Sequence, residues 1–392
     1  MSQVLIVQYS SNRDGSAFSG LLMADGLREA GWETHVAFGF DGPMVEVYER
    51  AGHCAHVAPH KNWLRRGWMP RFLKDVGQEW RRSSAFESII STVHPAAVYV
   101  NTVVSLSAAV AARRRGIPCI WHLREMFADI GGEMHAPRWA VPIVRRVIRW
   151  HADRLVANSA ATAQNLMGPL AQQASIIPNA VRSAFFDESR SQAAAREALN
   201  LSADDVIVGV PGTLRPMKGH LFFVEAIAPL LHRHPSMQVA ITGEGDEKVV
   251  AHVKERVREL QIKPRVHFLG WVRDMPAFYR ACDIACIPSR AEPFGRTAIE
   301  AFAVGTPVVA TAVGGLKDIV ADGKTGWLVP YSDRHALRDA VQEAVHNPDV
   351  RQKMSANARQ VADVKYHEKV YKKRIVELVS DQVREDPRTF PE

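Results

Sequence analysis

Two glutamates eight residues apart enclose a short loop and the start of an expected helix, in residues 292–300 with the sequence EPFGRTAIE. An apolar run ends just before them, and the helix is expected to begin near Gly295. A helix N-terminus presents free N–H groups and the positive end of its dipole, which suits a phosphate. Phe294, Gly295, Arg296 and Thr297 supply that N-terminus.

The two glutamates have different expected roles. Glu292 precedes the turn and would point toward a ligand, whereas Glu300 could accept hydrogen bonds from ribose hydroxyls, as an acidic residue does in dinucleotide sites. Two alternatives stay open. Thr297 and Glu300 have the spacing of a capping box, and Glu292 could be a solvated loop carboxylate.

A second loop carries positive charge, in residues 212–219 with the sequence GTLRPMKG. It follows one apolar run and precedes a helical pattern. Lys218, with Arg215, would place cations where a diphosphate lies, and charge-assisted bonds to phosphate are strong. A leaving nucleoside diphosphate gains negative charge, so such cations also stabilise a transition state. A basic surface loop is the alternative.

Further loops offer weaker signals at the ends of expected strands. His122 could bond a sugar hydroxyl or transfer a proton. Glycines that would let a backbone approach a ligand follow the other strands: Gly15, Gly243 with Gly245, and Gly314 with Gly315. Plain turns and a structural histidine explain these residues about as well.

The elements that must position these loops alternate between short apolar runs and helical patterns, which indicates an α/β fold with parallel sheets. The alternation restarts after residue 203, so we expect an N-terminal domain over 1–182, a second domain over 200–350 and C-terminal helices over 351–385 that cross back to the first domain. The expected strands lie at 4–8, 34–37, 97–101, 119–122, 154–158, 175–178, 206–209, 238–242, 266–269, 284–288, 307–310 and 326–329.

Composition is that of an ordinary globular chain of two domains: 392 residues, 47% apolar and 23% charged. No segment is apolar enough to span a membrane, and residues 1–7 read as a first strand rather than a signal peptide. The four cysteines are too scattered for a disulfide framework, and Cys282 and Cys286 are expected to be buried and reduced. We therefore expect a cytoplasmic protein.

The net charge of +7 is concentrated in the N-terminal half. Through Arg182 there are 20 Lys and Arg against 14 Asp and Glu, and beyond it 29 against 28. Such a field favours an anionic partner, although solubility alone is an equal explanation.

Several motifs are absent from the sequence. No two aspartates are separated by a single residue, and no Cys/His cluster has zinc spacing, so no metal site is predicted. No Gly-x-Gly-x-x-Gly opens the first helix, which disfavours a nicotinamide dehydrogenase.

These motifs together resemble the family 4 retaining glycosyltransferases of GT-B fold over nearly the whole chain. The eight-residue spacing of Glu292 and Glu300 around Pro-Phe-Gly is the family's signature. The other segments that look like the family are 157–159, 177–179, 269–272, 283–284, 288–289, 301–309 and 323–326.

The resemblance implies two Rossmann-like domains facing a central cleft and metal-independent hexosyl transfer, with no cofactor, from a UDP- or GDP-sugar to a hydroxyl acceptor. Glu300 would bind ribose, Glu292 the donor sugar, and Lys218 the diphosphate with help from the amides near Gly295. His122 matches a histidine beside the reacting sugar.

Three positions depart from the family pattern. Thr213 stands where the family has a diphosphate-binding arginine, and Arg215 is the candidate to replace it. The first loop has Gly15-Ser16 in place of Gly-Gly, and Ala180 follows Asn179 in place of glycine.

Residues 63–72 and 145–150 mix aromatic residues with arginines and could rest on an anionic bilayer. Such contact favours a lipid-linked or phosphate-bearing acceptor, as in surface polysaccharide or glycolipid synthesis. It also favours a location at the inner face of the membrane. A solvated helix face is the alternative. A nucleotide-sugar epimerase of the same shape and a basic nucleic-acid-binding module are two other readings of the sequence. The Glu-Pro-Phe-Gly signature disfavours the first, and the modest charge, without any nucleic-acid motif, disfavours the second.

Overall fold

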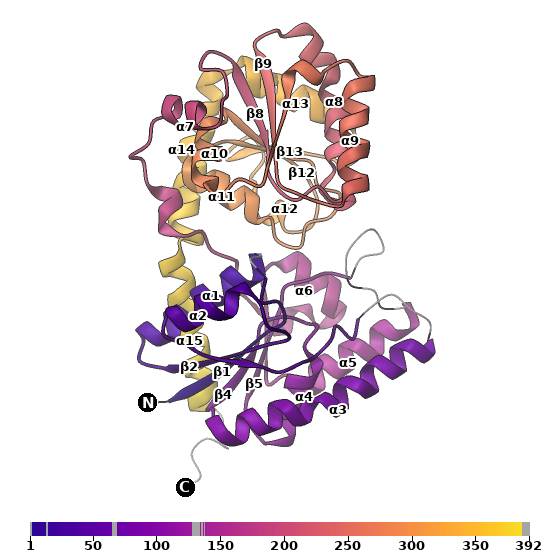
Figure 1. The fold of residues 1–392 in the computed structure, drawn as a ribbon, viewed down its shortest axis with the longest axis vertical. Helices are drawn as coiled ribbons and strands as arrows, with labels where there is room; N and C mark the ends of the chain where they lie inside the picture. Colours follow the sequence, from indigo (N-terminus) through magenta and orange to yellow (C-terminus); the bar gives the residue numbers. More distant parts are fainter. Residues whose placement is uncertain are drawn as a thin grey trace. The chain divides into compact units, whose positions relative to one another are not determined.

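The computed structural model describes residues 2–12, 15–64, 69–127, 134, 136 and 138–385. They form two compact units. The first runs to Asn179 and also takes the segment from Glu368 onward, and the second spans Ala180–His367. Each unit is a parallel sheet covered by helices, so the expected α/β class with two Rossmann-like domains is confirmed (Figure 1).

The first unit is built on a seven-stranded parallel sheet of order β3-β2-β1-β4-β5-β6-β7. Its strands are β1 (Gln3–Gln8), β2 (Glu33–Phe38), β3 (Cys54–Val57), β4 (Ala97–Val100), β5 (Cys119–Leu123), β6 (Arg154–Ala157) and β7 (Ala174–Ile176). Its helices are α1 (Gly15–Glu29), α2 (Pro43–Arg50), α3 (Met69–Val93), α4 (Leu106–Arg114), α5 (Val141–His151), α6 (Ala160–Met167) and α15 (Glu368–Glu385). Helix α4 packs between α3 and α5, whereas α15 packs on α1.

The second unit has a six-stranded parallel sheet of order β10-β9-β8-β11-β12-β13. Its strands are β8 (Val206–Val210), β9 (Met237–Thr242), β10 (Val266–Gly270), β11 (Ile284–Ile287), β12 (Val308–Thr311) and β13 (Gly326–Val329). Its helices are α7 (Gln192–Ala198), α8 (His220–Arg233), α9 (Glu247–Glu259), α10 (Met275–Ala281), α11 (Arg296–Val304), α12 (Leu316–Ile319), α13 (Arg334–His346) and α14 (Pro348–Val361). Helix α8 contacts α9 and α13, and α11 contacts α10 and α14.

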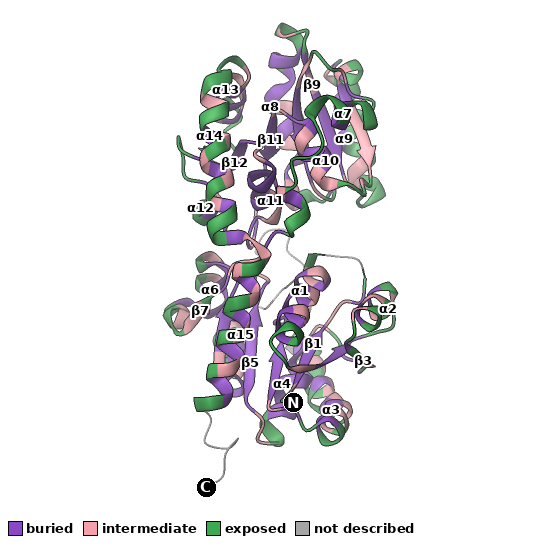
Figure 2. Ribbon diagram, turned by 90° about the vertical axis from the view of Figure 1, so that its left-hand side faces the viewer, coloured by how far each residue is buried: buried purple, intermediate pink, exposed green. Residues whose placement is uncertain are grey.

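Burial explains the sequence pattern. The central strands are buried along nearly their whole length, because helices cover both faces of a parallel sheet (Figure 2). Most outer helices are buried on one side only and carry the longer amphipathic period, whereas α4 and α11 are buried along most of their length. Cys282 and Cys286 are buried and free, as expected.

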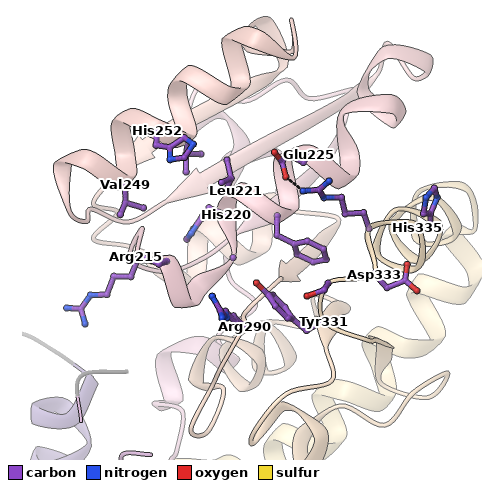
Figure 3. A pocket seen from close by; sticks show the side chains of 16 residues that line it. Arg215, His220, Leu221, Glu225, Val249, His252, Arg290, Tyr331, Asp333 and His335 are labelled. Carbon is purple, nitrogen blue, oxygen red and sulfur yellow. Dashed lines mark hydrogen bonds and ion pairs between the residues drawn. The ribbon is translucent and has the colours of Figure 1, made fainter. Parts of the chain in front are cut away.

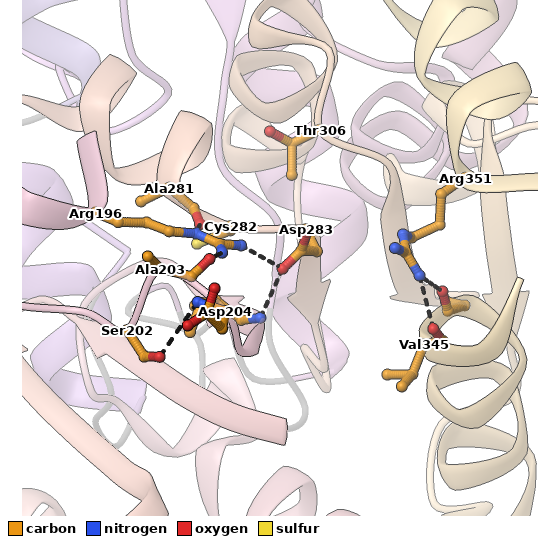
Figure 4. Close-up of polar contacts among 12 residues, drawn as sticks. Arg196, Ser202, Ala203, Asp204, Ala281, Cys282, Asp283, Thr306, Val345 and Arg351 are labelled. Carbon is orange, nitrogen blue, oxygen red and sulfur yellow. Dashed lines mark hydrogen bonds and ion pairs between the residues drawn. The ribbon is translucent and has the colours of Figure 1, made fainter. Parts of the chain in front are cut away.

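An ion pair fixes the strands β8 and β11 at their starting ends (Figure 4). Arg196 of α7 contacts Asp283 Oδ2 at 2.7 Å, and the same oxygen accepts the backbone N–H of Ile207 at 2.7 Å. Arg196 also donates to the carbonyl oxygens of Ala281 and Ala203. Both charged side chains are largely buried, so removing either one would leave a poorly solvated charge.

The C-terminal helix belongs to the first unit, as expected for a helix that crosses back. A Cβ added to Gly26 of α1 would lie 2.8 Å from Lys372 Cβ, so the two helices approach closely. Lys372 Nζ contacts Glu29 Oε1 at 2.6 Å beside this contact. The helices expected over 351–385 divide between the units, because α14 packs on α11 in the second unit and only α15 joins the first.

One strand was missed by the sequence patterns. β3 is an edge strand of four residues whose side chains are half-buried or exposed, and its sequence, Cys-Ala-His-Val, lacks an apolar run. Short edge strands of this kind carry no strong periodic signal.

Candidate functional site

The two motifs of the second unit converge at one place in its sheet. Strand order reverses between β8 and β11, and ligands of open α/β sheets bind beyond the carboxyl ends of strands at such a switch point. The loop 212–219 follows β8 and the loop 288–295 follows β11, so the topology brings them together.

An ion pair joins these loops. Lys218 Nζ lies 2.6 Å from Glu292 Oε2, and Ser289 Oγ donates to the same oxygen at 3.4 Å. The Lys218 side chain is 21% exposed and that of Glu292 9%. Glu292 is therefore no freely solvated loop carboxylate, and the site presents an ammonium and a carboxylate side by side.

Glycines allow the loops to pack backbone against backbone. Gly219 has φ +72°, and a Cβ there would lie 1.9 Å from the Pro288 carbonyl oxygen. A Cβ on Gly314 would lie 1.8 Å from the Glu292 carbonyl oxygen, which also accepts the Gly315 N–H at 2.9 Å. These glycines hold the loop that carries Glu292.

The glycines after β9 have a similar structural role. A Cβ on Gly243 would lie 2.3 Å from the Gly212 carbonyl oxygen, and one on Gly245 would lie 2.1 Å from that of Leu214. Leu214 N–H donates to Glu244 in the same turn. The contact between the two loops explains why these positions are glycine, and a ligand role for Gly243 and Gly245 stays a prediction.

Glu300 lies on α11, is only 7% exposed, and is fixed through both of its oxygens. Arg296 Nε donates to Oε1 at 2.8 Å and the Tyr279 hydroxyl donates to Oε2 at 3.1 Å. Burial, and then the adjacent Glu300 carboxylate, raise the pKa of Tyr279 well above its usual value, so the phenol remains a donor.

The capping-box alternative for Glu300 is wrong. The N-cap of α11 is Gly295, with φ +110° and no side-chain cap. Thr297 therefore lies inside the helix, and its buried Oγ1 has no hydrogen-bond partner. The Phe294 ring packs in the core against Tyr366, so only its backbone could serve a phosphate.

A cavity of about 930 Å³ lies in the second unit beside the N-terminal ends of α8, α9 and α13 (Figure 3). Arg215 and Arg290 line it, as does His220, but Lys218, Glu292 and Glu300 do not. Burial, and then the charge of Lys218, lower the pKa of His220 to about 4, so the imidazole is neutral. Arg215 thus lies on the loop of Lys218 but borders a neighbouring space.

The candidate residues of the first unit are Gly15 and His122. Gly15 is the first residue of α1, and the preceding Asp14 lies outside the described residues. His122 is the last residue but one of β5 and is fully buried. Tyr99 Oη lies 2.9 Å from its Nδ1, and Arg124 donates to that nitrogen at 3.4 Å.

These contacts fix the protonation of His122. An arginine can only donate, so Nδ1 accepts and the ring proton sits on Nε2. Nε2 is buried and has no hydrogen-bond partner. Burial, and then the Arg124 charge, lower the pKa of His122 well below its usual value, so the ring is a neutral N–H donor rather than a cation.

Arg124 bonds the candidate His122, and sequence reasoning did not single it out. It is 7% exposed and bonds side chains from four parts of the first unit: Ser19, Asn101, Asn179 and Tyr371. Its position two residues after His122 gave the only sequence signal. Tyr279, which holds Glu300, gave none, because the two residues lie 21 positions apart.

Comparison with known proteins places the chain in a family. Residues 14–185 match Glycosyltransferase Family 4, and residues 191–361 match Glycosyl transferases group 1. The chain is 30% identical over 254 residues to the lipopolysaccharide core biosynthesis mannosyltransferase LpsB of Rhizobium meliloti, covering 58% of this chain and 70% of that protein. The chain belongs to the family 4 glycosyltransferases.

A second curated relative and a solved structure are also similar to this chain. A D-inositol 3-phosphate glycosyltransferase of Kribbella flavida is 35% identical over 53% of this chain and 51% of its own length. The chain spans about half the length of several curated glycosyltransferases that it matches. The Anabaena protein HepE, crystallised with UDP and glucose, shares the fold with a TM-score of 0.81 at 22% identity, over 97% of this chain and all of HepE.

The candidate site residues of this family 4 glycosyltransferase are divided between its two units. Gly15 and His122 lie in the first unit. The others lie in the second, where Lys218 meets Glu292, Arg296 meets Glu300, and Arg215 lines the adjacent cavity.

Proposed function

We propose that this protein transfers a hexosyl group from a UDP- or GDP-sugar to a hydroxyl acceptor, with retention of configuration and without a metal ion. The observation that carries the proposal is the contact of Lys218 with Glu292 at the switch point of the second sheet. In a nucleotide-sugar the sugar is bonded directly to the diphosphate, so groups that bind the two must also be neighbours. The ammonium suits the diphosphate and the carboxylate suits sugar hydroxyls.

The other donor contacts follow from α11. Its N-terminus offers the amides of Gly295, Arg296 and Thr297 to a phosphate. Glu300, held by Tyr279 and Arg296, accepts hydrogen bonds from the ribose hydroxyls.

Lys218 and Arg215 offset the negative charge that develops on the leaving diphosphate.

His122 has a binding role in this proposal. Its Nε2–H is a buried donor without a partner, and an unmade buried hydrogen bond costs about 1–3 kcal/mol. A donor-sugar hydroxyl oxygen would satisfy it. Because the ring is neutral, it supplies orientation rather than charge.

Retention is proposed to proceed by front-face displacement. The bond from the anomeric carbon to the diphosphate oxygen breaks while the acceptor oxygen bonds the same face of that carbon. The acceptor proton passes to the departing phosphate, so no protein nucleophile is needed. Mass spectrometry of enzyme quenched during turnover tests this step, and a glycosyl adduct on the protein would contradict it.

We propose that the acceptor bears a phosphate or is linked to a lipid. The reaction would then belong to surface polysaccharide or glycolipid synthesis and take place at the inner face of the membrane. Support comes from exposed apolar side chains on helices α3 and α5, which both contact α4. They are Leu73, Trp80, Ile143 and Trp150. Arg113 lies over the Trp150 ring at 4.4 Å, so positive charge accompanies them. Part of the aromatic segment 63–72 lies outside the described residues.

No helix among the described residues is long and apolar enough to cross a bilayer. We propose binding to the membrane surface through the exposed side chains of α3 and α5, and flotation with anionic and neutral liposomes tests it. Binding to the anionic vesicles alone is expected, and failure to float with either would contradict it.

The test of the donor proposal is thermal stabilisation across a panel of UDP-, GDP- and ADP-sugars. A ligand at 100 times its dissociation constant adds about 2.7 kcal/mol to the free energy of unfolding. We expect one base and one sugar to stabilise the protein most, and Glu300→Gln to reduce that shift. No response to any nucleotide-sugar would contradict the proposed function.

A further inference from the structure

The edge of the first sheet brings together three side chains that are far apart in sequence. Strand β3 pairs with β2 in parallel, with His35 directly opposite Cys54. Glu33 lies two residues before His35, and alternate residues of a strand face the same side. Glu33, His35 and Cys54 therefore share one face of the sheet, at the starting ends of their strands.

The donor atoms of these side chains converge. A Glu33 carboxylate oxygen, a His35 ring nitrogen and Cys54 Sγ all lie within 4.8 Å of one another. His35 Nε2 is 3.3 Å from Glu33 Oε1. That nitrogen is buried and makes no hydrogen bond, and His35 as a whole is only 9% exposed. A ring nitrogen without a hydrogen bond thus lies beside a carboxylate and a free thiol.

Neighbouring residues hold two of the three side chains from behind. His56 Nε2 lies 3.0 Å from His35 Nδ1, and the two rings stack with centroids 5.3 Å apart. Gln3 Nε2 donates to Glu33 Oε2 at 3.0 Å, which leaves Oε1 toward the cluster. Metal-binding histidines and carboxylates have outer partners of this kind, which fix the ring and select the coordinating atom.

We propose that Glu33, His35 and Cys54 bind a zinc ion. Imidazole nitrogen, thiolate sulfur and carboxylate oxygen are the ligands that Zn²⁺ accepts, whereas Mg²⁺ and Ca²⁺ prefer oxygen alone. The thiol loses its proton to solvent on binding, and the thiolate and the carboxylate then balance the two positive charges. The Glu33 side chain is 43% exposed and Cys54 is exposed, so water completes the tetrahedron.

The consequence of zinc binding is structural. The ion would join β2 to the four-residue edge strand β3, which has only one neighbouring strand. The site lies at the starting ends of β2 and β3, whereas His122 lies near the carboxyl end of β5, three strands away from β2. It is therefore independent of the proposed sugar transfer.

The first test is metal binding by the full chain after treatment with a chelator. Isothermal titration with Zn²⁺ is expected to give one site per chain, and titration with Co²⁺ to give a thiolate-to-cobalt absorption band in the near ultraviolet. Cys54→Ser should abolish the band and weaken Zn²⁺ binding at least tenfold, and His35→Gln should weaken it similarly. The absence of zinc binding by the wild-type chain, or unchanged binding by Cys54→Ser, would overturn the proposal.

The controls separate loss of the site from loss of the fold. His94→Asn removes an exposed histidine of the same unit at a position with φ +49°, which asparagine tolerates, and it should bind zinc as the wild type does. Cys54 is the one exposed cysteine among the described residues, so its alkylation rate is a second readout. Zn²⁺ should slow that alkylation in the wild type, and an unchanged rate counts against the site even if His35→Gln fails to fold.

Discussion

Lys218 Nζ lies 2.6 Å from Glu292 Oε2, although the two residues are 74 positions apart and follow different strands. The contact exists because β8 and β11 are neighbours in the sheet and because Gly219 lets the Lys218 loop approach Pro288 in the Glu292 loop. It holds a cation and an anion at the point where the strand order reverses.

Removal of Lys218 should affect both stability and activity. Lys218→Met leaves the Glu292 carboxylate without its partner, so we expect a loss of about 1–3 kcal/mol in the free energy of unfolding. The double variant with Glu292→Gln should recover most of that stability but not kcat/KM, which we expect to fall by about a hundredfold. Urea unfolding measures the change in the free energy of unfolding, and initial rates measure the change in kcat/KM. A double variant with restored activity would show that the pair is only structural.

Glu300→Gln should lower donor affinity with little effect on the fold. The amide oxygen can still accept from Arg296 or Tyr279, but it binds ribose hydroxyls more weakly than a carboxylate does. We expect about a tenfold rise in the dissociation constant of the nucleotide-sugar, measured by calorimetry. Tyr279→Phe is the matched control, because it keeps the carboxylate and removes one of its donors. Equal affinity in wild type and Glu300→Gln would exclude the ribose role.

Arg215 is expected to replace the arginine that Thr213 does not supply. Arg215→Ala should weaken donor binding about tenfold, as loss of one charge-assisted hydrogen bond does. Arg290→Ala removes a second arginine that lines the same cavity and should leave donor affinity unchanged. Equal losses in the two variants would indicate a general charge effect instead.

His122 should contribute through its N–H group rather than by titration. Since burial lowers its pKa well below 6.5, kcat/KM should show no limb from this residue near that pH. His122→Phe removes the donor and should reduce kcat/KM about tenfold to a hundredfold, whereas His122→Gln keeps an N–H and should lose less. A pH–rate profile whose limb near pH 6.5 disappears in His122→Gln would contradict the neutral-donor role.

Acid should destabilise the first unit through His60. Its ring is buried between Ser105 and the Ala58 carbonyl, and burial lowers its pKa from 6.5 to about 4. The unfolded chain therefore binds the extra proton between these values, and stability is lost as the pH falls from 6.5 to 4. The total loss from this residue is about 3 kcal/mol.

His60→Gln should flatten that dependence, because glutamine does not titrate. Unfolding free energies measured at intervals between pH 7 and 4 test it. The same slope in variant and wild type would mean that other groups carry the acid sensitivity.

The alternation of apolar runs and helical patterns was enough to predict the two α/β domains, since each strand buried on both faces must be nearly continuously apolar. The loops that carry Lys218, Glu292 and Glu300 were also readable, because glycines and charged residues after a buried strand are local features. The N-terminus of α11 at Gly295 followed from the same local pattern.

Only the tertiary structure decided the partners of those residues. The spacing of Thr297 and Glu300 allowed a helix cap, and the structure shows Glu300 bonded to Tyr279 and Arg296 instead. β3 had no periodic signal, so the convergence of Cys54 with His35 and Glu33 could not be seen before the strand pairing was known. The physical reason is the same in each case: periodicity and turn chemistry act over a few residues, whereas strand order and register determine which distant side chains meet.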